Sequence, residues 1–509
     1  MRSAADRFGL IIGLIAGLTG LIIGVTSWLN TAGAGNPREP LASSFVLDKP
    51  IVFLATDKAR QEYAEAINLL KQIHPDAREL SFDAANPQEV IAGFTEPEPQ
   101  YAIVFICPEE LDVNVAWNWL KACTQIDDDP FVDLRTGFIT GTSPQKVTDF
   151  VARIVSLHQG KIQLAGKFID HLGGNQMLGK TDFQQIPGNF MVPVYGERLG
   201  VESISHGAQG FSKERLNCLQ GAGIIHFGGH GYPDQIVDTL NGVYARKLGL
   251  SPAVIFNGAC YTGVTGNWFD VSTGKLQEKK VKPETAFALG MLENNAVAYL
   301  AALHPDHGIP VYQEMEYLAW SGASLGDVIK YTYDGVVIGN GGKMPELPKL
   351  VTGMSLNWSP AEIMLRGTAA RVLFGDPTLS PLRAFTRPPI KVNISTFADS
   401  GLRVELSPEN LLLKASFTNT FAAELANGNP FNDRAHAKVP LPEDLPEISE
   451  VLLEKISAGG KEMKGRLVGY AIERDRGSRF LHLQVDMPAS GYMTGDFRRQ
   501  DSSIVITIR

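Results

Sequence analysis

The sequence predicts an α/β protein with a parallel-rich sheet flanked by helices, followed by a C-terminal all-β sandwich of immunoglobulin-like type. From residue 50, short apolar runs alternate with amphipathic stretches, as at YAIVFI (101–106) followed by LDVNVAWNWLKAC (111–123). Such alternation is typical of a parallel sheet covered on both faces. After Arg387 the pattern changes to short alternating runs separated by turn residues, which favours an antiparallel sandwich of about 100 residues.

The individual elements follow from local signals along the chain. Residues 57–73 have helical periodicity, with Thr56 or Asp57 as the cap. The helix expected at 143–157 has Ser143 as its cap and Pro144 at its first position. Residues 160–222 show no clear period. The other elements are expected at 50–56, 79–82, 86–94, 137–141, 284–295, 296–303, 310–322, 324–337, 359–366, 370–382, 390–396, 402–407, 411–418, 465–475, 479–487 and 502–509.

The N-terminus contains a long apolar segment, Phe8 to Leu29, without a charged residue. At about 1.5 Å per residue a helix of this length crosses about 30 Å of hydrocarbon, so it predicts a transmembrane anchor. Arg2 and Arg7 precede it, and this positive bias places the N-terminus in the cytoplasm and the rest of the chain outside. A cleaved signal peptide is the alternative, because residues 32–34 have the small-residue shape of a cleavage site; without residues 1–34 the protein would be secreted.

Length and composition set further bounds. The chain of 509 residues allows two or three domains, and its net charge of −9 gives no reason to expect a nucleic-acid partner. Four cysteines are too few for a disulfide framework. The expected parts are an anchor or signal segment at 1–30, a linker at 31–48, an N-terminal α/β subdomain at 49–126, a domain with the candidate site at 127–386 and the sandwich at 387–509.

Two short blocks, GAGIIHFGGHG (221–231) and PAVIFNGACYTG (252–263), carry the candidate site. Each is a strand-like apolar run that presents one reactive side chain where it ends, His230 in the first and Cys260 in the second. A thiol with a pKa of about 8.5 is a weak nucleophile near neutral pH, and a neighbouring imidazole activates it. The blocks therefore predict a cysteine nucleophile with a histidine base, and the N–H groups of Gly231 and Cys260 are the candidate oxyanion donors.

Other interpretations of these residues stay open. A His or a Cys in an apolar run is more often a packed core residue. His226 and His230 have the spacing of helical metal ligands, but they lie in a strand and a glycine turn, where residues four apart do not converge. His304 and His307 follow another strand and lack a third ligand. Burial is the favoured interpretation for the other cysteines, Cys107, Cys123 and Cys218.

Five segments in order resemble the gingipain family of cysteine peptidases, which are relatives of the caspases in fold. HFGGHG and FNGAC resemble the His-Gly and Ala-Cys blocks of that family. Residues 127–155 resemble its Asp-rich loop, strand and helix, and residues 284–303 resemble the helix and strand that follow its nucleophile. FGDPTL (374–379) resembles the Phe-Gly-Asp-Pro-Ser-Leu stretch that closes its catalytic domain. Together these segments lie within residues 100–385.

The resemblance implies a caspase-like fold and an extracytoplasmic cysteine endopeptidase acting on protein or peptide substrates, with His230 as base and Cys260 as nucleophile. The sequence requires no cofactor, and calcium is implied by the family alone. Residues 160–222, which in the family supply an acid near the His and the acid that selects a basic side chain, do not align. The nearby acids Glu197, Glu202 and Asp234 have no assignable role. The alternative function is a catalytically silent relative that serves as a membrane-tethered binding or assembly module.

Overall fold

The computed structural model describes most of the chain between residues 44 and 509. The described residues are 44–45, 49–94, 98–172, 200–205, 219–237, 239–271, 276–306, 310–346, 350, 360–382, 390–397, 401–408, 432–443, 445, 447–458, 460–475, 477–488 and 503–509.

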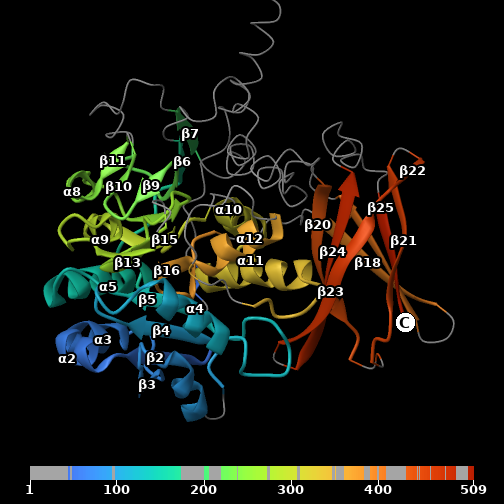
Figure 1. Ribbon diagram of the computed structural model, residues 1–509, viewed down its shortest axis with the longest axis horizontal. Helices are drawn as coiled ribbons and strands as arrows, with labels where there is room; N and C mark the ends of the chain where they lie inside the picture. The colour runs from blue at the N-terminus through green and yellow to red at the C-terminus, as the bar shows by residue number, and fades with distance from the viewer. Residues whose placement is uncertain are drawn as a thin grey trace, which may run out of the picture.

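A ten-stranded mixed sheet forms the centre of the first three quarters of the chain (Figure 1). Its strands are β2 (Ile51–Ala55), β3 (Arg78–Ser81), β4 (Tyr101–Phe105), β5 (Arg135–Ile139), β6 (Lys167–Leu172), β7 (Gly200–Ser205), β8 (Ile224–Gly228), β12 (Ala253–Asn257), β15 (Ala296–Ala302) and β16 (Arg371–Gly375). The order is β3-β2-β4-β5-β16-β15-β12-β8-β6-β7. Every neighbouring pair is parallel except β15 and β16, so two parallel halves meet in opposite directions there.

The inner strands of this sheet are buried along their whole length. β4, β8, β12, β15 and β16 expose no residue to solvent, which explains why these strands are mostly apolar on both faces rather than alternating. The division expected between residues 126 and 127 falls just before β5. Because β4 and β5 pair in register from Tyr101↔Arg135 onward, the residues on either side of that division share one sheet.

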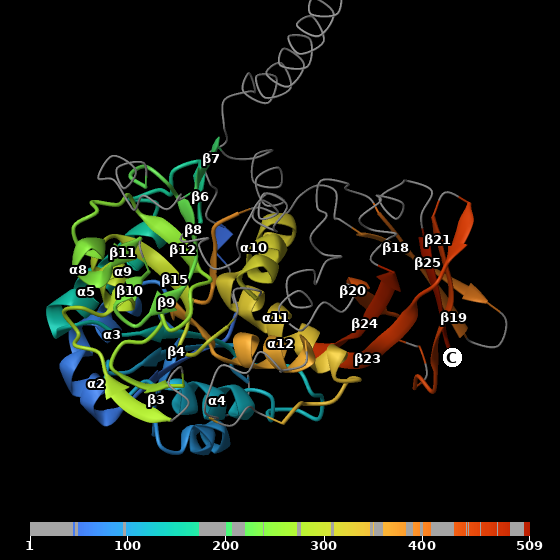
Figure 2. The same ribbon diagram turned by 45° about the horizontal axis from the view of Figure 1, so that its top comes forward.

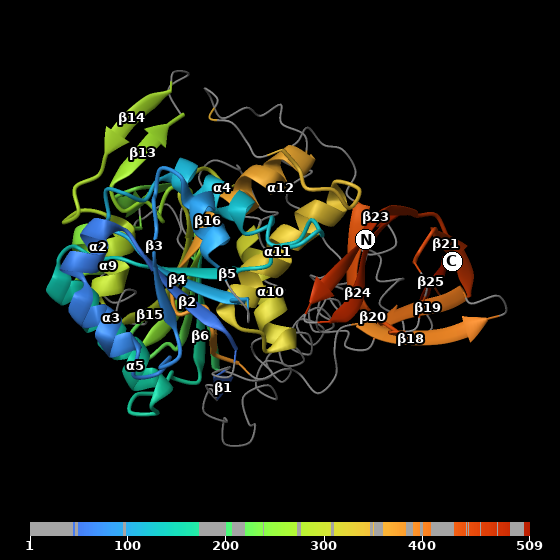
Figure 3. The same ribbon diagram turned by 90° about the horizontal axis from the view of Figure 1, so that it is seen from below.

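Helices cover both faces of the sheet (Figure 3). One layer contains α2 (Asp57–Glu62), α3 (Ala64–Leu70), α5 (Pro144–His158) and α9 (Phe287–Glu293), with α3 packing on α5 and α5 on α9. The other contains α4 (Val113–Ala122), α10 (Pro310–Ser321), α11 (Leu325–Gly339) and α12 (Pro360–Ala369), in which α12 touches α4, α10 and α11. The 3₁₀ helix η1 (Pro87–Gly93) packs beside α4. The prediction of a parallel-rich sheet between helices is therefore confirmed.

Local sequence explains where several helices begin. Ser143 Oγ accepts a hydrogen bond from the Lys146 N–H, and Pro144 occupies the first turn of α5, as predicted. Thr56, not Asp57, is the cap of α2, where its Oγ1 accepts from the Ala59 N–H at 3.2 Å. The single helix expected at 57–73 is wrong in one respect, because the chain leaves helical geometry at Tyr63 (φ −106°, ψ 19°) and begins again as α3.

The C-terminal part is a sandwich of two antiparallel sheets. Leucines, valines and isoleucines from both sheets form one buried cluster, separate from the core of the α/β part. One sheet has the order β18-β19-β25-β21-β22 and the other β20-β24-β23. The strands are β18 (Ile390–Phe397), β19 (Gly401–Pro408), β20 (Asn432–Leu441), β21 (Val451–Ala458), β22 (Lys461–Met463), β23 (Arg466–Asp475), β24 (Ser478–Pro488) and β25 (Ser503–Ile508). The strand expected at 411–418 lies outside the described residues.

Helix α11 connects the α/β part to the sandwich (Figure 1). Its buried Lys330 Nζ lies 2.7 Å from Asp334 Oδ2 and 2.8 Å from Glu473 Oε1 on β23. Arg135 Nη2 on β5 lies 3.3 Å from Asp475 Oδ2. Removing one partner of a buried ion pair costs about 3–5 kcal/mol, because the other charge stays desolvated. Buried ion pairs, in which each charge depends on its partner, thus hold the sandwich against the α/β part.

Small elements complete the described chain. β1 (Ser44–Phe45), within the expected linker, pairs antiparallel with β17 (Leu379–Ser380). No helix among the described residues is long and apolar enough to cross a membrane, and the expected anchor at 8–29 lies outside them. The remaining elements lie between β8 and β15: β9 (Gly231–Tyr232), β10 (Gln235–Ile236), β11 (Leu240–Asn241), α8 (Gly242–Ala245), β13 (Asn267–Asp270) and β14 (Gln277–Lys280).

Candidate active site

The strands that end in the two candidate residues are parallel neighbours (Figure 2). Phe227 on β8 is the register partner of Asn257 on β12, and the Gly258 N–H extends the ladder to the Phe227 carbonyl at 2.8 Å. His230 and Cys260 each follow these partners by three residues. Both therefore leave the sheet at its same edge, where the carboxyl ends of parallel strands place functional groups.

Gly231 brings the two blocks into direct contact. A Cβ atom at this position would lie 2.3 Å from the Cys260 carbonyl oxygen, 2.8 Å from Ala259 Cβ and 2.9 Å from Thr262 Cγ2. Only glycine fits without displacing the backbone that carries Cys260. The sequence suggested this glycine as a candidate oxyanion donor; the structure adds that it lets the histidine block pack on the cysteine turn.

Unusual backbone angles lie beside both candidate residues. Tyr261, directly after Cys260, has φ 63°, and Gly229, directly before His230, has φ 136°. A non-glycine residue with positive φ costs about 1–2 kcal/mol and persists only where its surroundings hold it. Tyr261 is held by ring contacts to Trp268 on β13 at 5.0 Å and to His304 at 5.9 Å between centroids. The sharp turn at Cys260 is thus built into the packing.

Accessibility separates Cys260 from the two other described cysteines. Cys260 is half-buried, and His230 is exposed. Cys107 and Cys123 are buried, as predicted. Burial raises the pKa of the Cys107 thiol to about 12 and also raises the pKa of Cys123, so neither supplies a thiolate near neutral pH. Cys218 lies outside the described residues.

The other histidines named from the sequence have different positions. His226 is fully buried within β8, whereas His230 is exposed. The two side chains, four residues apart, therefore do not lie on a common surface. His304 follows β15 and is fully buried between the rings of Tyr261 and Trp117. It therefore lies behind the cysteine turn and supports Tyr261. His307 lies outside the described residues.

No acid next to His230 is assigned among the described residues. Asp234 is exposed in the turn between β9 and β10, and its backbone carbonyl accepts from the Gly242 N–H at 2.8 Å. Glu202 lies on the edge strand β7, and Glu197 lies outside the described residues.

A buried ionic cluster beneath the cysteine turn was not predicted. Arg371, at the start of β16, donates from Nη1 to the Asn257 carbonyl at 2.8 Å and to Asp306 Oδ2 at 2.7 Å. Its Nη2 donates to Glu314 Oε2 at 2.7 Å. These side chains are almost completely buried. No sequence signal marks them, because they come from three separate segments of the chain and have no shared spacing.

The Asp-rich loop offers one possible cation site. Carboxylate oxygens of Asp127, Asp129 and Asp133 lie within 4.8 Å of one another. Burial raises the pKa of Asp129 to about 6 and that of Asp133 to about 8. Calcium prefers six to eight oxygen ligands, and both carboxylate oxygens of Asp129 already accept backbone N–H groups, of Phe131 and Arg474. These three side chains do not complete a calcium site by themselves, so calcium stays a prediction.

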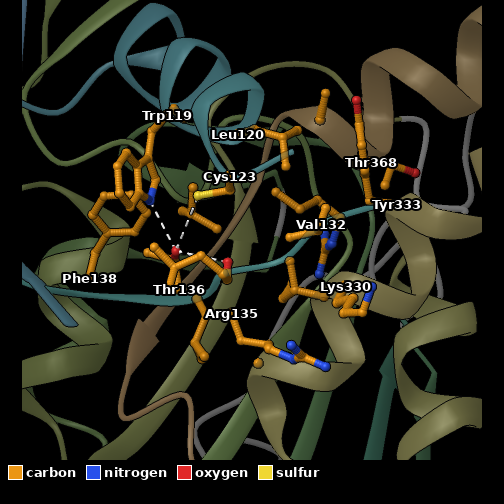
Figure 4. A pocket seen from close by; sticks show the side chains of 18 residues that line it. Trp119, Leu120, Cys123, Val132, Arg135, Thr136, Phe138, Lys330, Tyr333 and Thr368 are labelled. Carbon is orange, nitrogen blue, oxygen red and sulfur yellow. Dashed lines mark hydrogen bonds between the residues drawn. The ribbon is translucent and has the colours of Figure 1, made fainter. Parts of the chain in front are cut away.

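A cavity of about 50 Å³ lies elsewhere, between α4, β5, α11 and β16 (Figure 4). Trp119 and Cys123 line it on one side, and Thr368 and Tyr333 on the other. Trp119 Nε1 donates to Thr136 Oγ1 at 3.0 Å in its wall. Neither His230 nor Cys260 lines this cavity, so it is separate from the candidate site.

Comparison with known proteins gives structural likeness only. No family model and no curated protein sequence matches the chain. The complex of RgpB pro- and mature domains from Porphyromonas gingivalis is 11% identical with a TM-score of 0.46, covering 85% of this chain and 93% of that chain. The Arg-specific cysteine proteinase gingipain R is also 11% identical with a TM-score of 0.46, covering 87% and 93%. The Saccharomyces cerevisiae separase–securin complex is 13% identical with a TM-score of 0.34, covering 55% and 16%.

The first two of these structures belong to the family that the sequence motifs resemble. Identities of 11–13% with TM-scores below 0.5 say nothing of the activity of this chain. Its function has to be inferred from the residues at the edge of its own sheet.

Proposed function

We propose that this protein is a cysteine endopeptidase in which Cys260 is the nucleophile and His230 the base. The observation that carries the proposal is the packing of Gly231 on the Cys260 carbonyl at the ends of two adjacent parallel strands. Two strand ends joined in this way hold an exposed imidazole and a half-buried thiol at one edge of the sheet. This is the combination of a nucleophile and a base that thiol catalysis needs.

The chemical steps follow from these two groups. His230 takes the thiol proton, and the Cys260 sulfur attacks the carbonyl carbon of a peptide bond, forming a tetrahedral intermediate. The carbon–nitrogen bond then breaks, and the departing amine takes the proton from the imidazolium. Water, deprotonated by His230, attacks the resulting thioester and releases the acid product, which restores the thiol. No other co-reactant is needed for this sequence.

The Gly231 N–H is suited to stabilise the oxyanion. The Val237 N–H donates to the His230 carbonyl at 2.8 Å in the β9–β10 ladder. Hydrogen-bonded and non-bonded pairs alternate in an antiparallel ladder, so the next pair, Gly231↔Ile236, is the non-bonded one. The Gly231 N–H therefore points away from β10. Together with the Cys260 N–H it would provide the two donors that acyl transfer uses.

The test is hydrolysis of a peptide library by the full-length protein, together with alkylation of Cys260 mapped by mass spectrometry. Cys260→Ala should abolish turnover, and His230→Ala should lower both turnover and alkylation at neutral pH. Cys123→Ala is the matched control, because that thiol is buried in the wall of the separate cavity. Peptidase activity that survives Cys260→Ala would refute the proposal. A wild-type protein that binds peptides without cleaving them would favour the catalytically silent alternative.

We also propose that the C-terminal sandwich is immunoglobulin-like and supplies no catalytic group. Among the described residues it contacts α11, β5 and the Asp-rich loop, as in the pairs Lys330–Glu473, Arg135–Asp475 and Asp129–Arg474. Exchanging surface residues of the sandwich away from α11 should leave the peptide turnover unchanged. An essential side chain found on β18 or β22 would contradict this.

The location of the protein is a third proposal: residues 8–29 hold it in a membrane with the remainder outside the cytoplasm. The support is the uncharged run preceded by Arg2 and Arg7. Fractionation with protease digestion of intact and permeabilised cells tests it. A protein that remains protected in intact cells and is recovered in the soluble fraction would contradict it.

A further inference from the structure

We propose that Asn257 and Tyr299 act as positioning residues that fix the turn carrying Cys260. This inference rests on the proposed function, since it concerns how the nucleophile is aimed. Asn257 is the last residue of β12, and Tyr299 lies on the neighbouring strand β15. Neither residue stood out in the sequence as a functional candidate.

The two side chains close a continuous series of hydrogen bonds around the turn. Asn257 Oδ1 accepts from the Ala259 N–H at 2.8 Å, and Asn257 Nδ2 donates to Tyr299 Oη at 3.0 Å. Tyr299 Oη donates to the Thr262 carbonyl at 2.9 Å. Thr262 Oγ1 donates to the Ala259 carbonyl at 2.7 Å. Ala259 and Thr262 are thereby held on either side of Cys260.

Burial makes these bonds obligatory. Asn257, Ala259, Thr262 and Tyr299 have no measurable exposure to solvent. A buried polar group that loses its partner costs about 1–3 kcal/mol. Burial also raises the pKa of Tyr299, so its hydroxyl keeps the proton that it donates to Thr262. The hydrogen bonds of these buried groups are consequently all made in one conformation of the turn, which includes the positive φ at Tyr261.

Asn257 is fixed from its backbone as well as from its side chain. The Arg371 guanidinium donates to the Asn257 carbonyl at 2.8 Å and is itself held by Asp306 and Glu314. Asn257 is therefore held in a fixed position, and Cys260 follows it by only three residues. Because catalysis is sensitive to displacements of about 1 Å, loosening Asn257 is expected to act mainly on the chemical step.

The tyrosine ring is held independently of its hydroxyl. Its centroid lies 6.2 Å from that of Phe374 and 6.5 Å from that of Phe287. Tyr299→Phe therefore keeps the packing and removes only the link between Asn257 and Thr262. Tyr333→Phe is the matched control: that ring is also buried, and its hydroxyl donates to the Met344 sulfur at 3.5 Å, in the wall of the separate cavity.

The experiment compares Tyr299→Phe and Tyr333→Phe in the full-length protein. For Tyr299→Phe we expect kcat for peptide hydrolysis to fall about 10-fold to 100-fold with KM changed less than about twofold. Alkylation of Cys260 by iodoacetamide, mapped by mass spectrometry, should slow at neutral pH and shift its pH profile upward, because a displaced turn moves the thiol relative to His230, the proposed base. Tyr333→Phe should leave both readouts unchanged.

A second pair of variants tests the acceptor. Asn257→Asp keeps an oxygen for the Ala259 N–H, whereas Asn257→Ala removes it, so the aspartate should retain more Cys260 reactivity than the alanine. A Tyr299→Phe protein with kcat and alkylation profile equal to those of Tyr333→Phe would overturn the inference and leave Tyr299 a purely structural residue. If the wild type does not cleave peptides, the proposed function fails, but the alkylation profiles still decide whether Tyr299 positions the thiol.

Discussion

Replacing Gly231 by alanine tests the contact that joins the histidine and cysteine blocks. The added Cβ would lie 2.3 Å from the Cys260 carbonyl oxygen, whereas ordinary contact begins at 3.4 Å. The two backbones must therefore separate by about 1 Å. Overpacking of this kind costs about 1–3 kcal/mol of unfolding free energy. A displacement of about 1 Å at a nucleophile costs about 100-fold in rate.

The assay has three readouts: urea unfolding, kcat/KM on a cleaved peptide and the rate of Cys260 alkylation. Gly231→Ala should lose about 100-fold in kcat/KM and slow the alkylation, with a stability loss too small to unfold the protein. Gly93→Ala, at the end of η1, is the control, because its Cβ would meet only Leu80 Cδ1 at an ordinary 3.8 Å. If Gly231→Ala matched Gly93→Ala in all three readouts, the two blocks would not be packed as described.

Two further predictions concern buried charges. Burial opposes ionisation of Asp376, but His74 and His158, with Nε2 at 2.8 and 2.9 Å, outweigh it and hold its pKa well below the ordinary value. Its contribution to stability is thus complete above the unfolded-state pKa of about 3.9 and is lost as the pH falls below that value. Asp376→Asn should lower the unfolding free energy at pH 7 by about 3–5 kcal/mol and flatten its dependence on acid pH in urea titrations; an unchanged pH slope would contradict this. Lys330→Met should cost about 3–5 kcal/mol in the same assay, and adding Glu473→Gln should recover part of the loss, whereas simple additivity of the two changes would show that the charges are not coupled.

The sequence determined the elements whose signals are local. Ser143 and Pro144 mark the start of α5, because a capping hydroxyl and a proline in the first turn satisfy or avoid the unpaired N–H groups there. The fully apolar run at 296–302 is a buried strand, as its lack of alternation required. The change of pattern after Arg387 separated a sandwich from a helix-covered sheet. The two blocks with His230 and Cys260 were found because each ends an apolar run at small residues.

The tertiary structure decided what depends on partners distant in the chain. β6 and β7 gave no clear pattern, and they are strands because they pair with β8 and with each other at one end of the sheet. The helix expected at 57–73 divides at Tyr63, which is buried in the core. A local pattern does not report such contacts, because they depend on which surfaces the fold brings together.

The candidate site divides in the same way. Sequence reasoning named His230, Gly231 and Cys260, and the structure alone placed their strands side by side. It also showed that Gly231 is needed for contact with the Cys260 carbonyl. Asn257, Tyr299 and Arg371, which hold the turn, come from three strands and have no motif between them. Hydrogen bonds between buried groups are satisfied across the fold rather than along the chain, and for that physical reason the sequence identified the reactive pair but not the residues that position it.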